Sequence, residues 1–363
     1  MAISEALIPL LVAAISSACL TPLMMKMGIA LGVVDRPNQR KVSFREQIPL
    51  MGGPSIFIGC LLGLLSSVFM GTEPFIFQLR TLGFLSGGLI LLLVGLWDDR
   101  FYLSPWRKLP FQILAAVIAI WAGFSIDYFT NPFTLTTHAV PAWVGWPATL
   151  LWILLVTNAL NLIDGLDGLA SGIGAIVAMT LVTICWQANQ FSGALIGIAL
   201  LGALVGFLPF NFPPARVFLG DSGAYFVGFS LSLLAVQGYR KEAILTFLVP
   251  LLALAVPLLD VVLSVLRRIR RRQRIFSPDN MHVHHRLLRK EGTHRRAVLW
   301  LYFQAACFGL IAVSFSRLSG VASYILLIVV GILTIRLLRN LGLFSIESDE
   351  TEAENSVEST GTE

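Results

Sequence analysis

Charged residues are scarce in this chain of 363 residues. Asp, Glu, Lys and Arg make up 13% of it, whereas a soluble globular domain has about 25% charged residues. Hydrophobic residues make up 56%, and the mean hydropathy is +0.79. No hydrophilic block is long enough to form a separate soluble domain, and a net charge of +5 is not the signature of a nucleic-acid-binding protein. The composition predicts a polytopic membrane protein.

Cysteines are also few, and their placement excludes two kinds of site. The chain has four, none of them in a CxxC pair, and all lie in apolar runs: Cys19, Cys60, Cys185 and Cys307. Structural disulfides and a thiolate metal centre are therefore not expected.

Long apolar runs dominate the sequence. About twenty apolar residues cross a bilayer as a helix. We count eleven such runs, so an all-α bundle of about eleven transmembrane helices is expected. They lie at about 5–24, 52–71, 80–97, 110–124, 145–161, 169–186, 191–209, 223–238, 242–266, 297–315 and 319–335. A single transmembrane domain is expected over 1–344, and the acidic end, 345–363, is expected to be a disordered tail.

The basic residues predict the orientation of this bundle. With the N-terminus outside, the outer loops keep only four of the 26 Lys and Arg residues: Arg80, Arg240, Lys241 and Arg317. The other 22 fall on the inner side. Because cytoplasmic loops are enriched in Lys and Arg, the N-terminus is expected outside and the C-terminus in the cytoplasm.

One polar stretch stands out at a predicted membrane surface. After the apolar run 146–156 come Asn158, Asn161, Asp164 and Asp167, with Gly165 and Gly168 among them. Asn158, Asn161 and Asp164 are three residues apart and would share one face if the helix continued. Polar groups at this depth are costly and usually functional, so they are expected to hold a divalent cation, a phosphate through that cation, or a nucleobase.

Two further acidic motifs follow apolar runs on the same side. Asp98 and Asp99 come directly after the third run, with Lys108 nearby, and adjacent carboxylates repel each other unless a cation or a base role stabilises them. Asp221 lies between Gly220 and Gly223 in 210–223, whose two prolines and two glycines predict a loop and a cation or phosphate turn. A solvated helix end and a plain polar turn are the structural alternatives.

The inner loops supply positive charge. Arg40 and Lys41 suit an anionic headgroup or phosphate, with topological retention as the alternative. Three of the five histidines lie within four residues, beside an arginine: His282, His284, His285 and Arg286. This spacing is too tight for a zinc site on a regular element, and no cysteine is near. Charge-assisted donation to a diphosphate suits it better.

Taken in order, these motifs resemble the polyprenyl-phosphate N-acetylhexosamine-1-phosphate transferases, glycosyltransferase family 4. The resemblance runs from Asp35 to Arg286. It rests on Asn158-x-x-Asn161-x-x-Asp164-Gly-x-Asp167-Gly, on Asn211 ten residues before Asp221, and on His282-x-His284-His285-Arg286. It implies transfer of a sugar-1-phosphate, most closely N-acetylglucosamine-1-phosphate, from a UDP-sugar to undecaprenyl phosphate. UMP is released, and magnesium, or manganese in its place, is the cofactor.

The resemblance also implies residue roles. Asp221 would be the main magnesium ligand and Asn161 the second, Asp167 would accept from the uracil N–H, and Phe218 would stack on the ring. Asp98 is the candidate base, with Asp99 and Lys108 beside the lipid phosphate. His284, His285 and Arg286 would meet the diphosphate and sugar. The remaining residues expected to bind substrate are Asn158, Asp164, Asn211, His282, Arg40 and Lys41.

Such enzymes start O-antigen, lipopolysaccharide, teichoic acid and other cell-envelope polymers, so the inner membrane with a cytoplasmic active site is the expected location. The sugar, the pathway and the oligomeric state stay open, a homodimer included. Alternatives are phospho-N-acetylmuramoyl-pentapeptide transfer, an ion-coupled secondary transporter and a scaffolding membrane protein. The His-x-His-His-Arg motif favours the N-acetylglucosamine branch. A transporter would predict inverted repeats and mid-bilayer charges, whereas the Asn/Asp stretch is not repeated and most of the acids cluster at the cytoplasmic ends of the runs.

Overall fold

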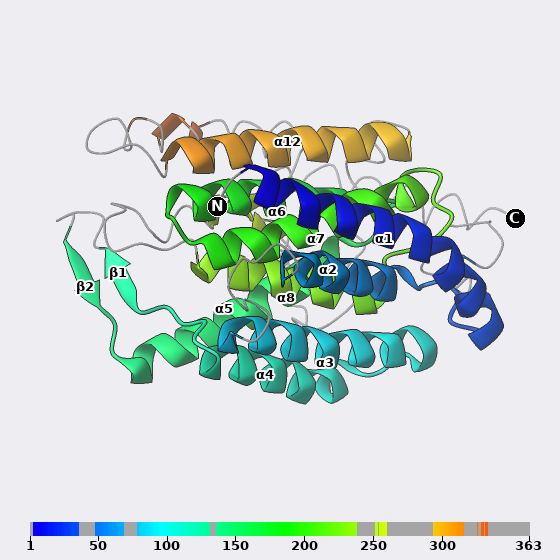
Figure 1. Ribbon diagram of the computed structural model, residues 1–363, viewed down its shortest axis with the longest axis horizontal. Helices are drawn as coiled ribbons and strands as arrows, with labels where there is room; N and C mark the ends of the chain where they lie inside the picture. Colours follow the sequence, from blue (N-terminus) through cyan, green and yellow to red (C-terminus); the bar gives the residue numbers. More distant parts are fainter. Residues whose placement is uncertain are drawn as a thin grey trace, which may run out of the picture. The chain divides into compact units, whose positions relative to one another are not determined.

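The protein is mostly helical in the part of the chain that the computed structural model describes (Figure 1). The described residues are 3–35, 48–68, 78–130, 136–237, 251–252, 254–259, 293–315, 325, 328–329 and 331–332. The named helices are α1 (Ile3–Leu31), α2 (Gly52–Val68), α3 (Leu79–Phe101), α4 (Pro105–Trp121), α5 (Ala142–Ile163), α6 (Leu169–Gln187), α7 (Phe191–Asn211), α8 (Gly220–Gln237) and α12 (His294–Phe315).

Six of these helices are long and apolar enough to cross a membrane, and α2 is a shorter apolar one. The six are α1, α3, α5, α6, α7 and α12. Many of their outward side chains are large and hydrophobic, as expected where lipid rather than water surrounds the helices. The chain is therefore a polytopic helical membrane protein. The total of eleven spans and the orientation of the termini stay predictions.

Helix α8 is the centre of the packing. Every residue from Ser222 to Gln237 is buried, and α2, α3, α5, α6 and α7 all contact the helix. Small residues let the backbones approach: a Cβ on Gly95 of α3 would meet the backbone of Asp221 and Ser222, and one on Gly53 of α2 would meet Ser222 and Gly223. Close contact of this kind is how helices associate where no hydrophobic effect drives them together. It brings the end of α3 against the start of α8.

A small β-hairpin is the one departure from the all-α prediction among the described residues. Strands β1 (Tyr128–Thr130) and β2 (Thr137–Ala139) pair antiparallel in the segment that the sequence marked only as an outer loop. Aromatic and β-branched residues favour extended backbone, and the Val140 N–H closes the hairpin on the Asp127 carbonyl.

The chain divides into two compact units, residues 1–317 and 318–363. All the named helices belong to the first. The acidic segment 345–363 lies outside the described residues, so its predicted disorder stays a prediction, as does the domain boundary at 344.

Candidate active site

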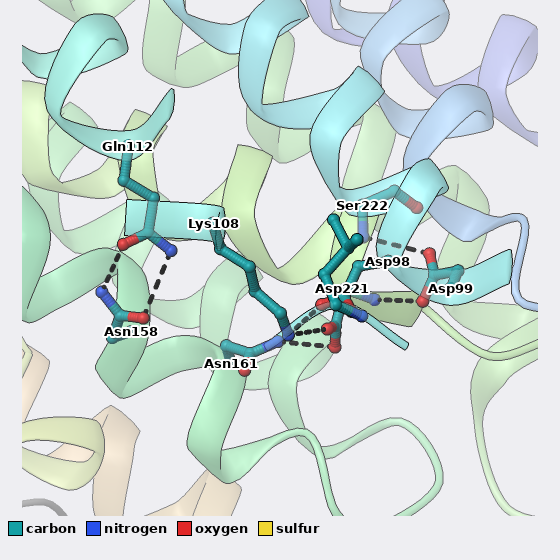
Figure 2. A network of polar contacts seen from close by, with 9 residues as sticks. Asp98, Asp99, Lys108, Gln112, Asn158, Asn161, Asp221 and Ser222 are labelled. Carbon is teal, nitrogen blue, oxygen red and sulfur yellow. Dashed lines mark hydrogen bonds and ion pairs between the residues drawn. The ribbon is translucent and has the colours of Figure 1, made fainter. Parts of the chain in front are cut away.

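Five polar side chains from four helices meet at the start of α8 (Figure 2). We call them the acid cluster: Asp98 and Asp99 of α3, Lys108 of α4, Asn161 of α5 and Asp221 of α8. The residues are separated by up to 123 positions in the sequence, yet each was a predicted site residue. The structure thus brings the predicted metal ligands and the predicted lipid-phosphate residues into one network.

Asp221 is the hub of the acid cluster. Its Oδ2 accepts from the Lys108 ammonium at 3.2 Å and its Oδ1 accepts from the Asn161 amide at 2.8 Å. The predicted loop is present over 212–219, but its extension to Asp221 was wrong, because Gly220 adopts a positive φ of 73° and starts α8. Asp221 therefore lies in a first helical turn, where the helix dipole favours a negative charge.

The two adjacent acids of α3 face different partners. Helix α3 continues to Phe101, so successive side chains point about 100° apart. Asp98 forms an ion pair with Lys108 and accepts from the Leu103 N–H at 2.7 Å. Asp99 instead accepts from the backbone N–H groups of Asp221 at 2.8 Å and Ser222 at 3.2 Å. Asp99 thus satisfies the unpaired N–H groups that begin α8, as a capping residue does, but from another helix.

The charges of Lys108 and Asp221 support each other. Both residues lie in first turns, outside the six apolar helices. Burial acts to lower the pKa of Lys108, but the facing carboxylates of Asp221 and Asp98 outweigh it and the pKa is raised. Burial acts to raise the pKa of Asp221, but contacts with Asp98, Lys108 and Asn161 outweigh it and the pKa is lowered. Asp221 and Lys108 therefore stay ionised at neutral pH.

A reciprocal amide pair lies one helical turn away. Gln112 of α4 donates to the Asn158 Oδ1 at 3.3 Å, and Asn158 of α5 donates back to the Gln112 Oε1 at 2.9 Å (Figure 2). Gln112 is buried, with 3% of its surface exposed. Because Gln112 follows Lys108 by four residues and Asn158 precedes Asn161 by three, the pair fixes α4 against α5 beside the acid cluster.

A second polar group of residues holds the connection between α5 and α6. Helix α5 ends at Ile163, so Asp164 caps the helix and does not continue the face of Asn158 and Asn161 as the sequence suggested. Asp167 accepts from the Ala215 N–H at 3.0 Å, which ties this turn to the α7–α8 connection. Gly168 follows with a φ of 73°, a conformation that favours glycine, and begins α6.

Around this turn, side chains bind backbone groups. Asn211 is 2% exposed; its Oδ1 accepts from the Ser171 hydroxyl at 2.6 Å and its Nδ2 donates to the Val217 carbonyl at 2.9 Å. The Tyr302 hydroxyl of α12 donates to the Gly168 carbonyl. We call Asp167, Gly168, Ser171, Asn211 and Tyr302 the turn cluster. The substrate contacts predicted for Asp167 and Asn211 stay predictions, and in this structure both side chains hold the protein's own backbone.

Other predicted site residues lie apart from both clusters or outside the described part. Phe218 is partly buried against Met24, Val33, Leu50 and Met51, and its backbone N–H donates to the Pro49 carbonyl at 2.9 Å. Its stacking on a nucleobase stays a prediction. The basic and histidine residues of the inner loops lie outside the described residues: Arg40, Lys41, His282, His284, His285 and Arg286.

Sequence reasoning missed three contributors: Gln112, Ser171 and Tyr302. Gln112 had a detectable signal, since a polar residue four positions after Lys108 shares its helix face. In the sequence, Ser171 is indistinguishable from a small residue that packs an apolar helix, and Tyr302 from any aromatic residue of a membrane span. The long-range contacts that single them out are not visible in local sequence.

The charge of the acid cluster suits a cation. The cluster holds three carboxylates and one ammonium, and the carboxylates of Asp98 and Asp221 both approach the Lys108 Nζ. Within the described residues, no group of three His, Cys, Asp or Glu side chains forms a ready metal cage. Mg²⁺ is typically coordinated by one or two carboxylates together with water and substrate phosphates, and the donors of the acid cluster fit this coordination.

Comparison with known proteins identifies the family to which the chain belongs. The sequence pattern described as "Glycosyl transferase family 4" matches residues 81–239, which include the acid cluster. A Bacillus subtilis protein named "Probable undecaprenyl-phosphate N-acetylglucosaminyl 1-phosphate transferase" is 36% identical over 295 residues, 81% of this chain and 80% of that one. The Mycobacterium tuberculosis "Decaprenyl-phosphate N-acetylglucosaminephosphotransferase" is 32% identical over 324 residues, 82% and 79% of the two chains.

A third relative extends this similarity to another bacterial group. The Yersinia pestis "Undecaprenyl-phosphate alpha-N-acetylglucosaminyl 1-phosphate transferase" is 30% identical over 314 residues, 83% of this chain and 82% of that one. Identity at this level over about four-fifths of both chains shows the family: the chain belongs to glycosyl transferase family 4.

Proposed function

We propose that this protein transfers N-acetylglucosamine-1-phosphate from UDP-N-acetylglucosamine to undecaprenyl or another polyprenyl phosphate and releases UMP. The relatives named above carry this activity in their names, with undecaprenyl or decaprenyl phosphate as the acceptor. The single observation that carries the proposal within the structure is the acid cluster, because Asp98, Lys108 and Asp221 meet at one point on a membrane helix bundle.

The reaction is an exchange of phosphate bonds. An oxygen of the lipid phosphate attacks the phosphorus next to the sugar. The bond from that phosphorus to the bridging oxygen breaks, and UMP leaves with the bridging oxygen. The product is a lipid diphosphate sugar. Since both reactants are anions, the main task of the site is to neutralise and orient charge.

The acid cluster fits a magnesium ion as a cofactor. Asp221 would hold it, with the Asn161 side chain as a further donor. When bound, magnesium supplies positive charge against the diphosphate oxygens. The Lys108 ammonium, held between Asp98 and Asp221, adds positive charge of the protein's own, and it lies over the buried Tyr225 ring at 5.9 Å from the ring centroid.

The geometry favours Asp98 over Asp99 as the base. Asp99 has each carboxylate oxygen engaged by an N–H group of α8. Asp98 forms its ion pair with Lys108, whose side chain is long and flexible. Lys108 and Asp221 are both partly exposed, so the acid cluster is accessible on the side where Asp98 is bound. Asp98 would take the remaining proton of the lipid phosphate, and Asp99 would hold Asp221 in place.

This activity places the reaction at a membrane surface. The lipid acceptor stays in the bilayer, and a soluble nucleotide reaches it from the cytoplasm. The orientation predicted from the basic residues puts the acid cluster on that cytoplasmic side. We therefore propose the plasma membrane, with the active site on its inner face.

The test is release of UMP by the purified protein in detergent with undecaprenyl phosphate and magnesium. A panel of UDP-sugars is supplied, including UDP-N-acetylglucosamine and UDP-N-acetylmuramoyl-pentapeptide. We expect UDP-N-acetylglucosamine to be turned over fastest, and chelation of divalent metal to stop the reaction. Preferred turnover of the pentapeptide donor would move the protein to the peptidoglycan branch. No UMP from any donor would overturn the proposal.

A further inference from the structure

Helix α12 reaches into the turn that carries Asp167. The Tyr302 hydroxyl donates to the Gly168 carbonyl, and a Cβ on Gly172 would overlap the Tyr302 ring. The tyrosine thus occupies space that is open because position 172 is glycine. Neither α12 nor Tyr302 belongs to any motif that identified the site, and residues 81–239 of the family match end well before it.

The contact is part of a continuous path. The Gly168 carbonyl also accepts from the Gly172 N–H at 3.0 Å, and the Ser171 hydroxyl lies 3.1 Å from it. Ser171 leads on to Asn211, and Asp167 is bound to the Ala215 N–H. The turn is therefore held from three sides: by α6, by the α7–α8 connection and by α12.

A second side chain of α12 reaches the same place. Tyr302 and Arg295 are seven residues apart and so share a helix face. The Tyr302 ring lies 6.5 Å from the Phe212 ring, and the Arg295 guanidinium lies over the same Phe212 at 5.6 Å from its centroid. Phe212 directly follows Asn211 at the end of α7. Tyr302 and Arg295 thus fasten α12 to the α7–α8 connection as well as to the turn.

We propose that Tyr302 is a positioning residue for the sugar-nucleotide donor: by holding the Gly168 carbonyl, it fixes the turn from which Asp167 recognises the base. This inference rests on the proposed function and on the role that the family resemblance implies for Asp167, acceptance from the uracil N–H. Asp167 reaches its place through a backbone that can rotate at Gly165 and Gly168. An anchor on the Gly168 carbonyl removes that freedom before the donor arrives, which is the general gain from preorganisation.

The first experiment compares Tyr302→Phe with the wild type. The substitution removes the hydroxyl and keeps the ring against Phe212. UMP release is measured with UDP-N-acetylglucosamine varied at saturating undecaprenyl phosphate, and with the lipid varied at saturating donor. We expect the donor KM to rise about three- to tenfold, as loss of one hydrogen bond allows, with kcat and the lipid KM nearly unchanged. Tyr128→Phe, the same change on the hairpin, is the matched control.

A specificity readout separates positioning from general stability. Inhibition by UDP and by CDP is compared, because cytosine lacks the N–H that Asp167 would accept from. Tyr302→Phe should lower the preference for UDP over CDP by about the same factor by which it raises the donor KM. A purely structural role would lower the thermal midpoint and leave this preference as in the wild type, which would overturn the inference.

Gly172→Ala tests the same contact from the other side. Its methyl group would displace the Tyr302 ring, so the donor KM should rise as it does in Tyr302→Phe. In a Tyr302→Ala background the added methyl group meets no ring, so Gly172→Ala should raise the donor KM little further. Full additivity of the two substitutions would contradict the contact.

The outcomes for the two proposals are separable. A wild-type protein that turns over UDP-N-acetylglucosamine while Tyr302→Phe keeps wild-type donor KM and wild-type preference overturns only the role of Tyr302. A wild-type protein that neither turns over UDP-sugars nor binds UDP in calorimetry overturns the proposed function, and the role of Tyr302 with it.

Discussion

The acid cluster and the turn cluster lie on the same helix bundle but are held together by different forces. In the acid cluster, charged side chains contact one another, and Asp221 and Lys108 stay partly exposed, at 33% and 17% of their side chains. In the turn cluster, neutral and acidic side chains bind backbone groups, and Asn211 is almost completely buried.

The difference indicates a division of labour. Three carboxylates against one ammonium leave the acid cluster with an excess of negative charge, which a divalent cation and its phosphate ligands would balance. In the turn cluster, Asp167, Asn211 and Tyr302 form hydrogen bonds with the protein's own backbone, so the cluster holds a shape. Substitutions in the acid cluster should therefore lower the rate of the chemical step, and those in the turn cluster should change the affinity for the donor.

The largest effect is expected for Asp221→Asn. The amide keeps the shape of the side chain but loses the negative charge that holds a metal ion and the Lys108 ammonium. We expect kcat for UMP release to fall by at least about two orders of magnitude, as when a key electrostatic group is removed from a transition state. The thermal midpoint should fall little, since an acid in a first helical turn contributes only about 0.3–1 kcal/mol.

Asp127→Asn serves as the control, because Asp127 is exposed and accepts from Ser125 near the hairpin. It should leave the rate unchanged. Near-normal turnover of Asp221→Asn in magnesium would show that the metal assignment is wrong and would remove the main contrast between the two clusters.

Asp98→Asn should lower the rate in a way that depends on pH. The second pKa of a phosphate monoester is about 6, so below that pH the lipid phosphate keeps a proton that a base must remove. Loss of a general base costs about two to four orders of magnitude. The loss should be greatest at acidic pH, and activity should recover partly as the pH rises and the acceptor ionises unaided. The measurement is kcat against pH, with donor binding followed by calorimetry.

A rate loss that is the same at every pH would contradict the base role of Asp98 and would point to a purely electrostatic one. A lost affinity for the donor would place Asp98 on the nucleotide side of the site instead.

Asp99→Asn should separate the two neighbouring acids. An amide oxygen can accept from one of the two N–H groups of α8, while the amide nitrogen opposes the other. We expect the free energy of unfolding to fall by about 1–3 kcal/mol, the cost of a buried unsatisfied group, and the rate to fall by a factor that does not change with pH. Thermal unfolding and the same pH–rate series measure both. A pH-dependent loss here, and not in Asp98→Asn, would exchange the roles of the two acids.

The membership of the acid cluster could be predicted from the sequence, because carboxylates and amides at the ends of apolar helices have few structural explanations. The contacts could not be predicted. Asp98 and Asp99 are the same residue type at adjacent positions, and their partners depend on α3 continuing to Phe101 and on the close approach that Gly95 allows. Two prolines and two glycines predicted a loop around Asp221, whereas the positive φ of Gly220 starts a helix there.

The turn cluster was less predictable for a physical reason. Asp167 and Asn211 were recognised as polar residues and assigned to substrate, but the groups they bind are backbone amides and carbonyls, which no sequence pattern marks. Tyr302 lies 134 residues after Gly168. An aromatic residue in an apolar helix has the same appearance whether it packs against lipid, against another helix or, as here, against a functional turn.

The smallest effect is expected for the amide pair of Gln112 and Asn158, which tests whether a neutral contact beside the acid cluster acts as scaffold or as site. Gln112→Leu removes one partner, and interhelical hydrogen bonds in membranes contribute about 0.6 kcal/mol on average and up to about 1.7. We expect the free energy of unfolding to fall within that range and the rate to fall about tenfold or less.

The double variant Gln112→Leu/Asn158→Leu decides between the two roles, because replacing both partners by apolar groups is often nearly neutral for stability. If Asn158 only joins α4 to α5, the double variant should regain the stability and the rate together. If Asn158 also binds substrate, as its sequence motif predicts, stability returns and the donor KM stays raised. Thermal unfolding in detergent and steady-state UMP release distinguish the two outcomes. The second outcome would show that Asn158 both joins α4 to α5 and binds substrate beside the acid cluster.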